Sequence, residues 1–336
     1  MKKIALIIPY FTSGGGNFPA YFQFFLNSCA DNPTIDWLIY TDDAFLFETP
    51  ENVYVHKCSF EWFRNRLQGL FDFEITLDKP YKLCDYRPAY GQALEEDLRS
   101  YDYWGYCDCD VIFGDIRKFV QKALSEDYDK LFTRGHLSIY RNDKTVNEFY
   151  RKTNRYKIVY SNPQPFAFDE WSGISQMYQS FGRPYYDELV YDDIKTQWDG
   201  FHLTKAYRGA YHEKNDISQI DKFKAMRYIY YEHKDGQLIR KCIMHRRTFS
   251  EEVLYVHFQK RPLSPFSLEV GLDCRNYIVL PNKVLPYRSI SYEDMRNELQ
   301  RSETIRNFFL EQKQKLYSIY LRHIKPKVKP DLTLMY

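Results

Sequence analysis

The sequence predicts an α/β protein built on a Rossmann-like mixed sheet flanked by helices, with a C-terminal helical extension. Three observations support this fold class. An apolar run at 3–10 is typical of a central parallel strand that is covered on both faces. A helix-like segment and two further strand-like runs follow it, as at the start of a doubly wound sheet. With 336 residues, 44% of them hydrophobic, the chain can form one large domain or two coupled halves.

Composition narrows the range of partners. The net charge of +2 gives no reason to expect nucleic acid binding. No apolar run reaches the roughly 18 residues that a membrane span needs. The 7 cysteines show no metal-site spacing and fit a reducing cytoplasm. Aromatic residues make up 18% of the chain, which is typical either of a surface that binds sugars or proteins or of a compositional bias of the genome.

The first half of the chain predicts a site at the carboxyl ends of its strands. Strands are expected at 3–10, 37–41 and 53–58, with a helix at 18–29. Ligands of doubly wound sheets bind at such strand ends. Pro9 and Tyr10 end the first strand and Asp42 follows the second, so all three are candidate nucleotide contacts. Asp42 could equally cap the segment that follows it.

A polar cluster then precedes the helix expected to run to about residue 99. Lys82, Asp85 and Arg87 lie close together beside apolar anchors, and Pro88 suits the first turn of a helix. A lysine and an arginine at this place could neutralise a bound diphosphate. The alternative is a helix entry with solvated charges.

The stretch from Tyr103 to Gly114 is expected to be a buried strand that ends in Asp108-Cys109-Asp110. Side chains two positions apart in an extended chain point to the same side, so Asp108 and Asp110 could reach toward one point. Two carboxylates at a strand end suit Mn²⁺ or Mg²⁺, with a phosphate as a further ligand. They could instead be solvated acids or caps of the helix expected at 115–125.

The next segment supplies a second acid pair. A strand-like pattern at 131–141 and a helix at 146–155 precede a proline-rich loop, which delivers Asp169 and Glu170 to the start of another helix. Acidic residues at a helix N-terminus are favoured by the helix dipole, so the pair could be a cap. A carboxylate placed there could also be a general base.

The last third contains one informative strand and a basic tail. Asp235-Gly236 indicates a β-hairpin within 227–243. A strand at about 254–258 delivers His257, followed by Lys260 and Arg261, which together could complete a site for metal and diphosphate. The segment 292–324 is expected to be largely helical. Its basic end, 313–329, could rest on an anionic membrane surface or dock on the protein.

These residues together resemble a nucleotide-sugar glycosyltransferase of the GT-A fold. The resemblance is carried by the strand-end Asp-x-Asp, by Lys82 and Asp85, and by His257-Phe-Gln-Lys-Arg-Pro262. The last stretch is similar to the His-x-x-Gly-x-x-Lys-Pro-Trp signature of the glycogenin and lipopolysaccharide galactosyltransferase group. It lacks the glycine, and its lysine follows the histidine after three residues rather than six.

A second resemblance covers most of the first 260 residues. The phrases IPYF, NPTIDWLIYTDD, KPYKLCDYRPAYG, CDCDVIFGDIRKF and TRGH resemble a large bacterial family found among capsule and surface-polysaccharide genes. It implies three parts, namely a nucleotide-sugar-binding half at 1–125, an acceptor-binding and catalytic half of the same GT-A domain at 126–265, and the helical extension at 266–336.

The resemblance also implies a role for each candidate residue. His257, Asp110 and Asp108 would hold Mn²⁺ or Mg²⁺, with Asp110 the more direct ligand, since the first acid often contacts the ribose in this fold. The diphosphate would be contacted by the nearby cations Lys82, Arg87, Lys260 and Arg261. Asp169-Glu170 resembles the acid pair of inverting enzymes, so inversion is slightly favoured.

The expected function is metal-dependent transfer of a sugar from a nucleotide-sugar, a UDP-sugar by analogy with the fold, to a growing bacterial surface polysaccharide. The acceptor would be a glycan or lipid-linked glycan, and the enzyme cytoplasmic or peripheral on the inner face of the cytoplasmic membrane. Two alternatives stay open. A metal-dependent phosphotransferase or phosphohydrolase could use the same carboxylates, and a non-catalytic glycan-binding protein would explain the aromatic content.

Overall fold

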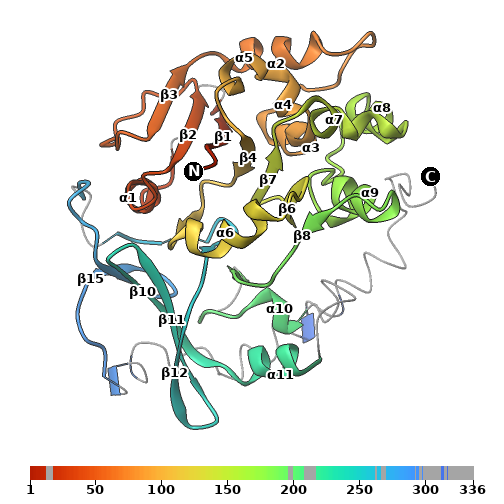
Figure 1. Ribbon diagram of the computed structural model, residues 1–336. Helices are drawn as coiled ribbons and strands as arrows, with labels where there is room; N and C mark the ends of the chain where they lie inside the picture. The colour runs from red at the N-terminus through yellow and green to blue at the C-terminus, as the bar shows by residue number, and fades with distance from the viewer. Residues whose placement is uncertain are drawn as a thin grey trace.

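The computed structural model describes residues 1–12, 18–195, 200–207, 217–261, 263–265 and 270–291, with isolated positions at 293, 294, 297, 312, 313 and 316. At its centre lies a seven-stranded mixed sheet of order β3-β2-β1-β4-β7-β6-β8 (Figure 1). Its strands are β1 Ile4–Tyr10, β2 Ile35–Thr41, β3 Val53–Lys57, β4 Tyr103–Cys107, β6 Lys130–Arg134, β7 Leu137–Arg141 and β8 Tyr185–Tyr186. Strands β1 to β4 are parallel, and β7 is antiparallel to its neighbours β4 and β6.

Helices cover both faces of this sheet. One face packs on α1 Phe22–Ala30 and α6 Ile116–Ser125. The other packs on α2 Phe60–Gln68, α3 Leu83–Tyr86, α4 Tyr90–Ala93, α5 Glu95–Leu98, α7 Lys144–Asn147, η3 Phe149–Lys152, α8 Arg155–Tyr160 and α9 Gln176–Ser180. The short turns η1 Pro80–Lys82, η2 Arg87–Ala89 and η4 Trp171–Ser175 link these elements.

Strand β1 shows why the apolar run at the start of the chain predicted this arrangement. Ala5 and Ile7 pack in the cluster with α2 and α4, whereas Ile4, Leu6 and Ile8 pack in the cluster with α1 and α6. Since alternate side chains of a strand point to opposite faces, a strand buried on both faces must be apolar throughout. The predicted mixed sheet flanked by helices is therefore confirmed.

Two smaller sheets accompany the central one, and the larger of them, which includes β10, β11 and β12, lies in the lower half of Figure 1. The first has the order β5-β13-β9, with β5 Val111–Phe113, β13 Tyr255–His257 and β9 Asp192–Asp193. The second has the order β12-β11-β10-β14-β15, with β10 Arg227–Lys234, β11 Gln237–Met244, β12 Arg247–Glu252, β14 Tyr277–Val279 and β15 Val284–Pro286. The helices α10 Thr204–Tyr207 and α11 Ile217–Ala225 lie beside them.

The hairpin predicted around Asp235-Gly236 is present. Lys234 pairs with Gln237, and Asp235 and Gly236 have φ values of 52° and 77°. Two positive φ angles in a two-residue loop match the right-handed twist of the flanking strands, which is why Asp-Gly is favoured there.

Two expectations need correction. The pattern at 131–141 is not one strand but the hairpin β6–β7, because the chain turns at Gly135 and His136. The segment 266–336 is not wholly a helical extension, since 277–279 and 284–286 form β14 and β15 at the edge of a sheet. These runs are too short to show a strand period in sequence.

Most of the remaining C-terminal segment, including nearly all of the basic stretch at 313–329, lies outside the described residues. Among the helices that are described, none combines the length and hydropathy needed to cross a membrane.

Candidate metal and nucleotide site

Strand pairing between distant segments brings the predicted metal ligands together. Asp108 and Asp110 lie in the short connection from β4 to β5, and β5 pairs antiparallel with β13. This register sets His257 opposite Val111, and the Phe258 N–H donates to the Asp110 backbone carbonyl at 2.9 Å. The last residue of β13 therefore faces the acid pair.

The three side chains converge on one point. His257 Nε2 lies 3.5 Å from Asp108 Oδ2 and 3.4 Å from Asp110 Oδ1. Neighbouring ligands of an octahedral ion, each about 2.1 Å from it, are separated by roughly 3 Å. One imidazole nitrogen and two carboxylates are also a donor set that Mn²⁺ accepts. The residues present thus fit a divalent metal, with small adjustments of the side chains.

Electrostatics keeps Asp110 ionised. Burial opposes a charge on this carboxyl, but His257 and the Lys260 backbone N–H, which donates to Oδ2 at 2.6 Å, lower its pKa to about 2. Burial also opposes a charge on His257, yet Asp110 and Asp193 raise its pKa well above the usual range. The carboxylates therefore stabilise a positive charge between them, which can be a proton on His257 or a metal ion.

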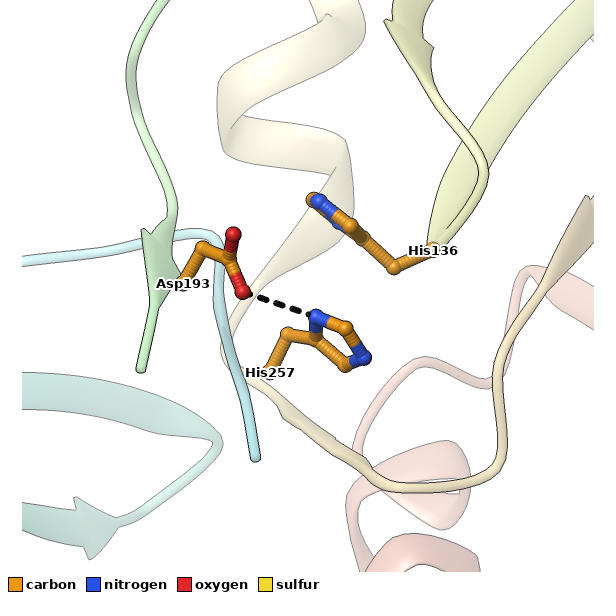
Figure 2. Close-up of side chains that lie close together, drawn as sticks. All are labelled: His136, Asp193 and His257. Atoms are coloured by element: carbon orange, nitrogen blue, oxygen red, sulfur yellow. Dashed lines mark hydrogen bonds and ion pairs between the residues drawn. The ribbon is translucent and has the colours of Figure 1, made fainter. Parts of the chain in front are cut away.

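Sequence reasoning missed Asp193, which contacts the far side of the His257 ring (Figure 2). His257 Nδ1 lies 3.0 Å from Asp193 Oδ1, and Gln259 Nε2 donates to the same oxygen at 2.6 Å. Asp193 belongs to β9, which pairs parallel with β13 and sets Asp193 beside His257. The only sequence signal was an Asp-Asp pair in a segment without a clear strand pattern.

Arg87 links the metal site to the second acid pair. Its guanidinium donates to Asp108 Oδ1, to Asp169 Oδ2 at 2.8 Å and to the Gly135 carbonyl at 2.6 Å. A Cβ atom on Gly135 would lie 2.6 Å from Asp169 Oδ2 and 2.9 Å from Glu170 Oε1. Gly135, in the turn between β6 and β7, therefore leaves the space that the Asp169 and Glu170 carboxylates occupy.

The second acid pair lies in an environment that favours protonation. Burial raises the pKa of Asp169 to about 8, although Arg87 opposes this shift. Burial likewise raises the pKa of Glu170, and Arg134 opposes it. Glu170 is the more accessible of the two, since Asp169 is 2% exposed. Acids with raised pKa values at the edge of a cavity are candidates for proton transfer.

Lys82 and Asp85 are not among the described residues that line the cavity next to the metal ligands, in contrast to our expectation, although Asp85 lies close to Asp169. The Lys82 ammonium donates to Asp85 Oδ2 at 2.7 Å and to the carbonyls of Val159 and Gln164 at 2.9 and 2.6 Å. Asp85, which is fully buried, also accepts from the backbone N–H groups of 166 and 168, both at 2.8 Å. The ion pair holds the proline-rich loop that carries Asp169 and Glu170, so its role is structural.

The site residues line a cavity of about 860 Å³. Its polar lining residues include Arg87, Asp108, Asp110, Asp169, Glu170, His257, Gln259 and Lys260. Apolar and aromatic residues line it as well, among them Pro9, Tyr10, Phe11, Pro19, Tyr21, Pro80, Tyr81 and Leu263. A volume of this order suits a cofactor-sized ligand, which pockets of about 300–1,000 Å³ accommodate.

The remaining candidates fall into two groups. Pro9, Tyr10 and Lys260 line the cavity as expected, and the Lys260 ammonium lies 4.6 Å from the centre of the Tyr81 ring. Arg261 also borders the cavity, but its guanidinium donates to the carbonyls of Pro281 and Lys195. Asp42 is not among the described lining residues and accepts from the Thr12 N–H at 2.9 Å, which ties the end of β2 to the residue two positions after β1.

The fold and site together define a mixed α/β protein with a candidate metal centre at the edge of a large cavity. Residues 6–288 match the model of DUF6625, described as a family of unknown function, and the chain belongs to that family. No curated protein matches the chain.

Several solved structures are similar at low identity. The galactosyltransferase LgtC, in complex with donor and acceptor sugar analogs, is 7% identical with a TM-score of 0.36, covering 76% of this chain and 86% of that one. Mouse xyloside xylosyltransferase 1 is 7% identical with a TM-score of 0.38, covering 76% and 97%. A glycosyltransferase involved in glycosylation of the major capsid of PBCV-1 is 12% identical with a TM-score of 0.33, covering 57% and 85%. Similarities this weak leave the function to be inferred from the site itself.

Proposed function

We propose that this chain is a metal-dependent glycosyltransferase of the GT-A type. It would move a sugar from a nucleotide-sugar, a UDP-sugar being favoured, to a glycan or lipid-linked glycan acceptor of a bacterial surface polysaccharide. The supporting observation is the convergence of Asp108, Asp110 and His257 in the lining of a cavity of about 860 Å³. The bacterial acceptor is proposed from the sequence resemblance, and the uridine base by analogy with the fold.

The aromatic and the charged residues of the cavity suit the two ends of a nucleotide-sugar. Tyr10, which ends β1, and Tyr21 line the cavity and offer rings on which a flat base could stack. The metal ligands and the exposed residue Lys260 line the same cavity. A diphosphate bound there would meet positive charge from Lys260 and from the metal site.

Each group of charged residues in the cavity has a distinct task in this proposal. A divalent metal held by Asp108, Asp110 and His257 would supply Lewis acidity at the diphosphate leaving group. Arg87 holds Asp108 and Asp169 in fixed positions by donating to both. Asp169 or Glu170 would accept the proton of the acceptor hydroxyl if the configuration inverts, or would position the acceptor if it is retained.

The first test is thermal unfolding with UDP-, GDP- and CDP-sugars, each with and without Mn²⁺. A ligand at about 100 times its Kd stabilises the folded state by roughly 2.7 kcal/mol, which gives a clear rise in Tm. We expect a metal-dependent rise with one nucleotide, a UDP-sugar first, and release of the nucleoside diphosphate when an acceptor is added.

The same panel separates the alternatives. Release of a nucleoside monophosphate and a sugar phosphate instead of a nucleoside diphosphate would favour the phosphohydrolase. A folded protein whose Tm responds to no nucleotide, but does respond to oligosaccharides, would favour the glycan-binding protein.

The raised pKa of Asp169 predicts a pH dependence. A general base works only when deprotonated, so with a pKa of about 8 the turnover should rise with pH and level off above that value. Asp169→Asn should lower turnover and remove this rise, whereas Glu170→Gln should keep the rise and move it to lower pH, because Glu170 contributes to the raised pKa of Asp169. The measurement is kcat from pH 6 to 9 at saturating metal and donor.

Unfolding provides the control for this assignment. Because the pKa of Asp169 is about 8 in the folded protein and 3.8 in the reference state, the folded state binds more protons between these values. The Asp169 contribution to the free energy of unfolding should therefore be present at low pH and be lost as the pH approaches 8. A pH dependence of turnover and stability that is the same in Asp169→Asn and wild type would contradict the assignment.

A further inference from the structure

Asp193 lies in the second layer of the proposed metal site. It is the last residue of the two-residue strand β9, and its side chain is 9% exposed. Neighbouring residues of a strand point to opposite sides, so Asp193 faces His257 while Asp192 faces the interior. Asp192 is held there by Arg240, by Lys205 at 3.2 Å and by the Tyr231 hydroxyl at 2.9 Å. This buried network anchors β9 and leaves Asp193 a fixed place beside β13.

The contacts of Asp193 determine what the His257 ring can present to the cavity. Asp193 Oδ1 lies 3.0 Å from His257 Nδ1, and a carboxylate there accepts the Nδ1–H bond. With the proton on Nδ1, the lone pair of a neutral ring lies on Nε2, which faces Asp108 and Asp110 at 3.5 and 3.4 Å. A lone pair aimed at two carboxylates is favourable only when a cation lies between them.

Two further contacts restrict this arrangement. Gln259 donates to the same Asp193 oxygen at 2.6 Å, which limits rotation of the carboxylate. The His136 ring stacks on the His257 ring with centroids 4.5 Å apart and an angle of 24° between the planes. His136 is itself fixed, since its Nδ1 lies 2.7 Å from the Tyr255 hydroxyl. Figure 2 shows His136 and Asp193 on different sides of His257.

We propose that Asp193 is a positioning residue, which acts through His257 by fixing its orientation and tautomer so that Nε2 binds the metal. This inference rests on the proposed function in one respect, the assignment of His257 as a metal ligand. The donor atoms of His136, Asp193 and His257 also lie within 4.8 Å of one another. Asp193 and His257 are hydrogen-bonded to each other, however, so this group supports the neighbouring site and is not a second one.

The test measures Mn²⁺ binding to the full chain without nucleotide, by the electron paramagnetic resonance signal of free Mn²⁺. Removing a carboxylate that orients a metal-binding histidine typically weakens metal binding by about 10–100-fold. We expect Asp193→Asn to raise the Mn²⁺ Kd by this factor and Asp193→Glu to restore part of it. In a His257→Gln background, Asp193→Asn should have no further effect, because its effect passes through the ring.

Asp129→Asn is the matched control. Asp129 is a buried carboxylate held by Arg141 and Arg183, and it is not among the described residues that line the cavity. The Asp129→Asn variant should be less stable than the wild type but should bind Mn²⁺ with the wild-type affinity. Thermal unfolding of each variant separates loss of fold from loss of metal.

The outcomes separate this inference from the proposed function. Wild-type Mn²⁺ affinity in Asp193→Asn, or an equal loss in the His257→Gln background, would overturn the role of Asp193 alone. Mn²⁺ binding without a response to any nucleotide-sugar would overturn the glycosyltransferase and leave the test of Asp193 valid. A wild type that binds no Mn²⁺ would overturn both.

Discussion

Replacing Asp110 by asparagine should reduce turnover by about 10³-fold, which corresponds to roughly 4 kcal/mol of lost transition-state stabilisation. Asparagine has the same shape and can still accept the Lys260 N–H that Asp110 binds at 2.6 Å, so the fold should persist. It carries no charge, so the site loses one of two carboxylates that would hold the metal. The measurement is kcat with the donor identified in the panel, over a range of Mn²⁺ concentrations.

Asp115→Asn is the matched control for this substitution. Asp115 also follows a strand, but it caps α6 by accepting the Lys118 N–H at 3.1 Å. Asparagine serves as well as aspartate at this position of a helix, so turnover and stability should both stay near the wild-type values. A turnover of Asp110→Asn within about fivefold of wild type would contradict the metal site, since the loss expected for a Lewis acid is several kcal/mol.

Replacing Asp85 by alanine should lower the free energy of unfolding by about 3–5 kcal/mol, because it leaves the Lys82 ammonium as an unpaired charge in the interior. The side chains of Lys82 and Asp85 are 4% and 0% exposed, so water cannot replace the lost partner. The backbone N–H groups of Phe166 and Phe168 would lose their acceptor as well. Denaturation in urea measures the loss as a shift of the midpoint at constant slope.

The control here is Asp78→Asn, an exposed carboxylate shortly before η1. Its effect should stay within about 0.5 kcal/mol, as for most surface substitutions. An Asp85→Ala variant that keeps wild-type stability but loses affinity for the nucleotide-sugar would restore the original expectation, that Asp85 binds the cofactor. Loss of stability with unchanged affinity under folding conditions would instead support the structural role.

The sequence predicted correctly those features that a single strand or its immediate neighbours determine. The apolar run of β1 predicted a strand buried on both faces, and the spacing of Asp108 and Asp110 predicted a shared direction for their side chains. His257 could be placed near a strand end because the polar residues 259–261 follow shortly after it. In each case the signal, an apolar run or polar residues next to one, lies within about ten residues. Alternation along a strand was not the cause for Asp108 and Asp110, because both lie in the connection from β4 to β5.

Local pattern could not separate a buried ion pair from a ligand contact. In sequence, Lys82 and Asp85 look like a cation and an anion of a binding site. Only their contacts with the loop at 162–170 show that they hold this loop in place. Asp193 was missed for a related reason. Its role depends on the pairing of β9 with β13. Both strands are very short, and Asp193 and His257 are 64 positions apart in the sequence.

The pairing of β5 with β13 has a consequence for synthesis of the chain. Asp110 and Lys260, which are hydrogen-bonded in the finished site, are 150 positions apart. At about 5–20 residues per second, the ribosome needs roughly 8–30 s to reach the second after making the first. During that interval β1 to β4 can already form a sheet, while β5 still lacks its neighbour and the two carboxylates lack their histidine. The site can therefore be completed only after residue 260 has been made, well after β1 to β4.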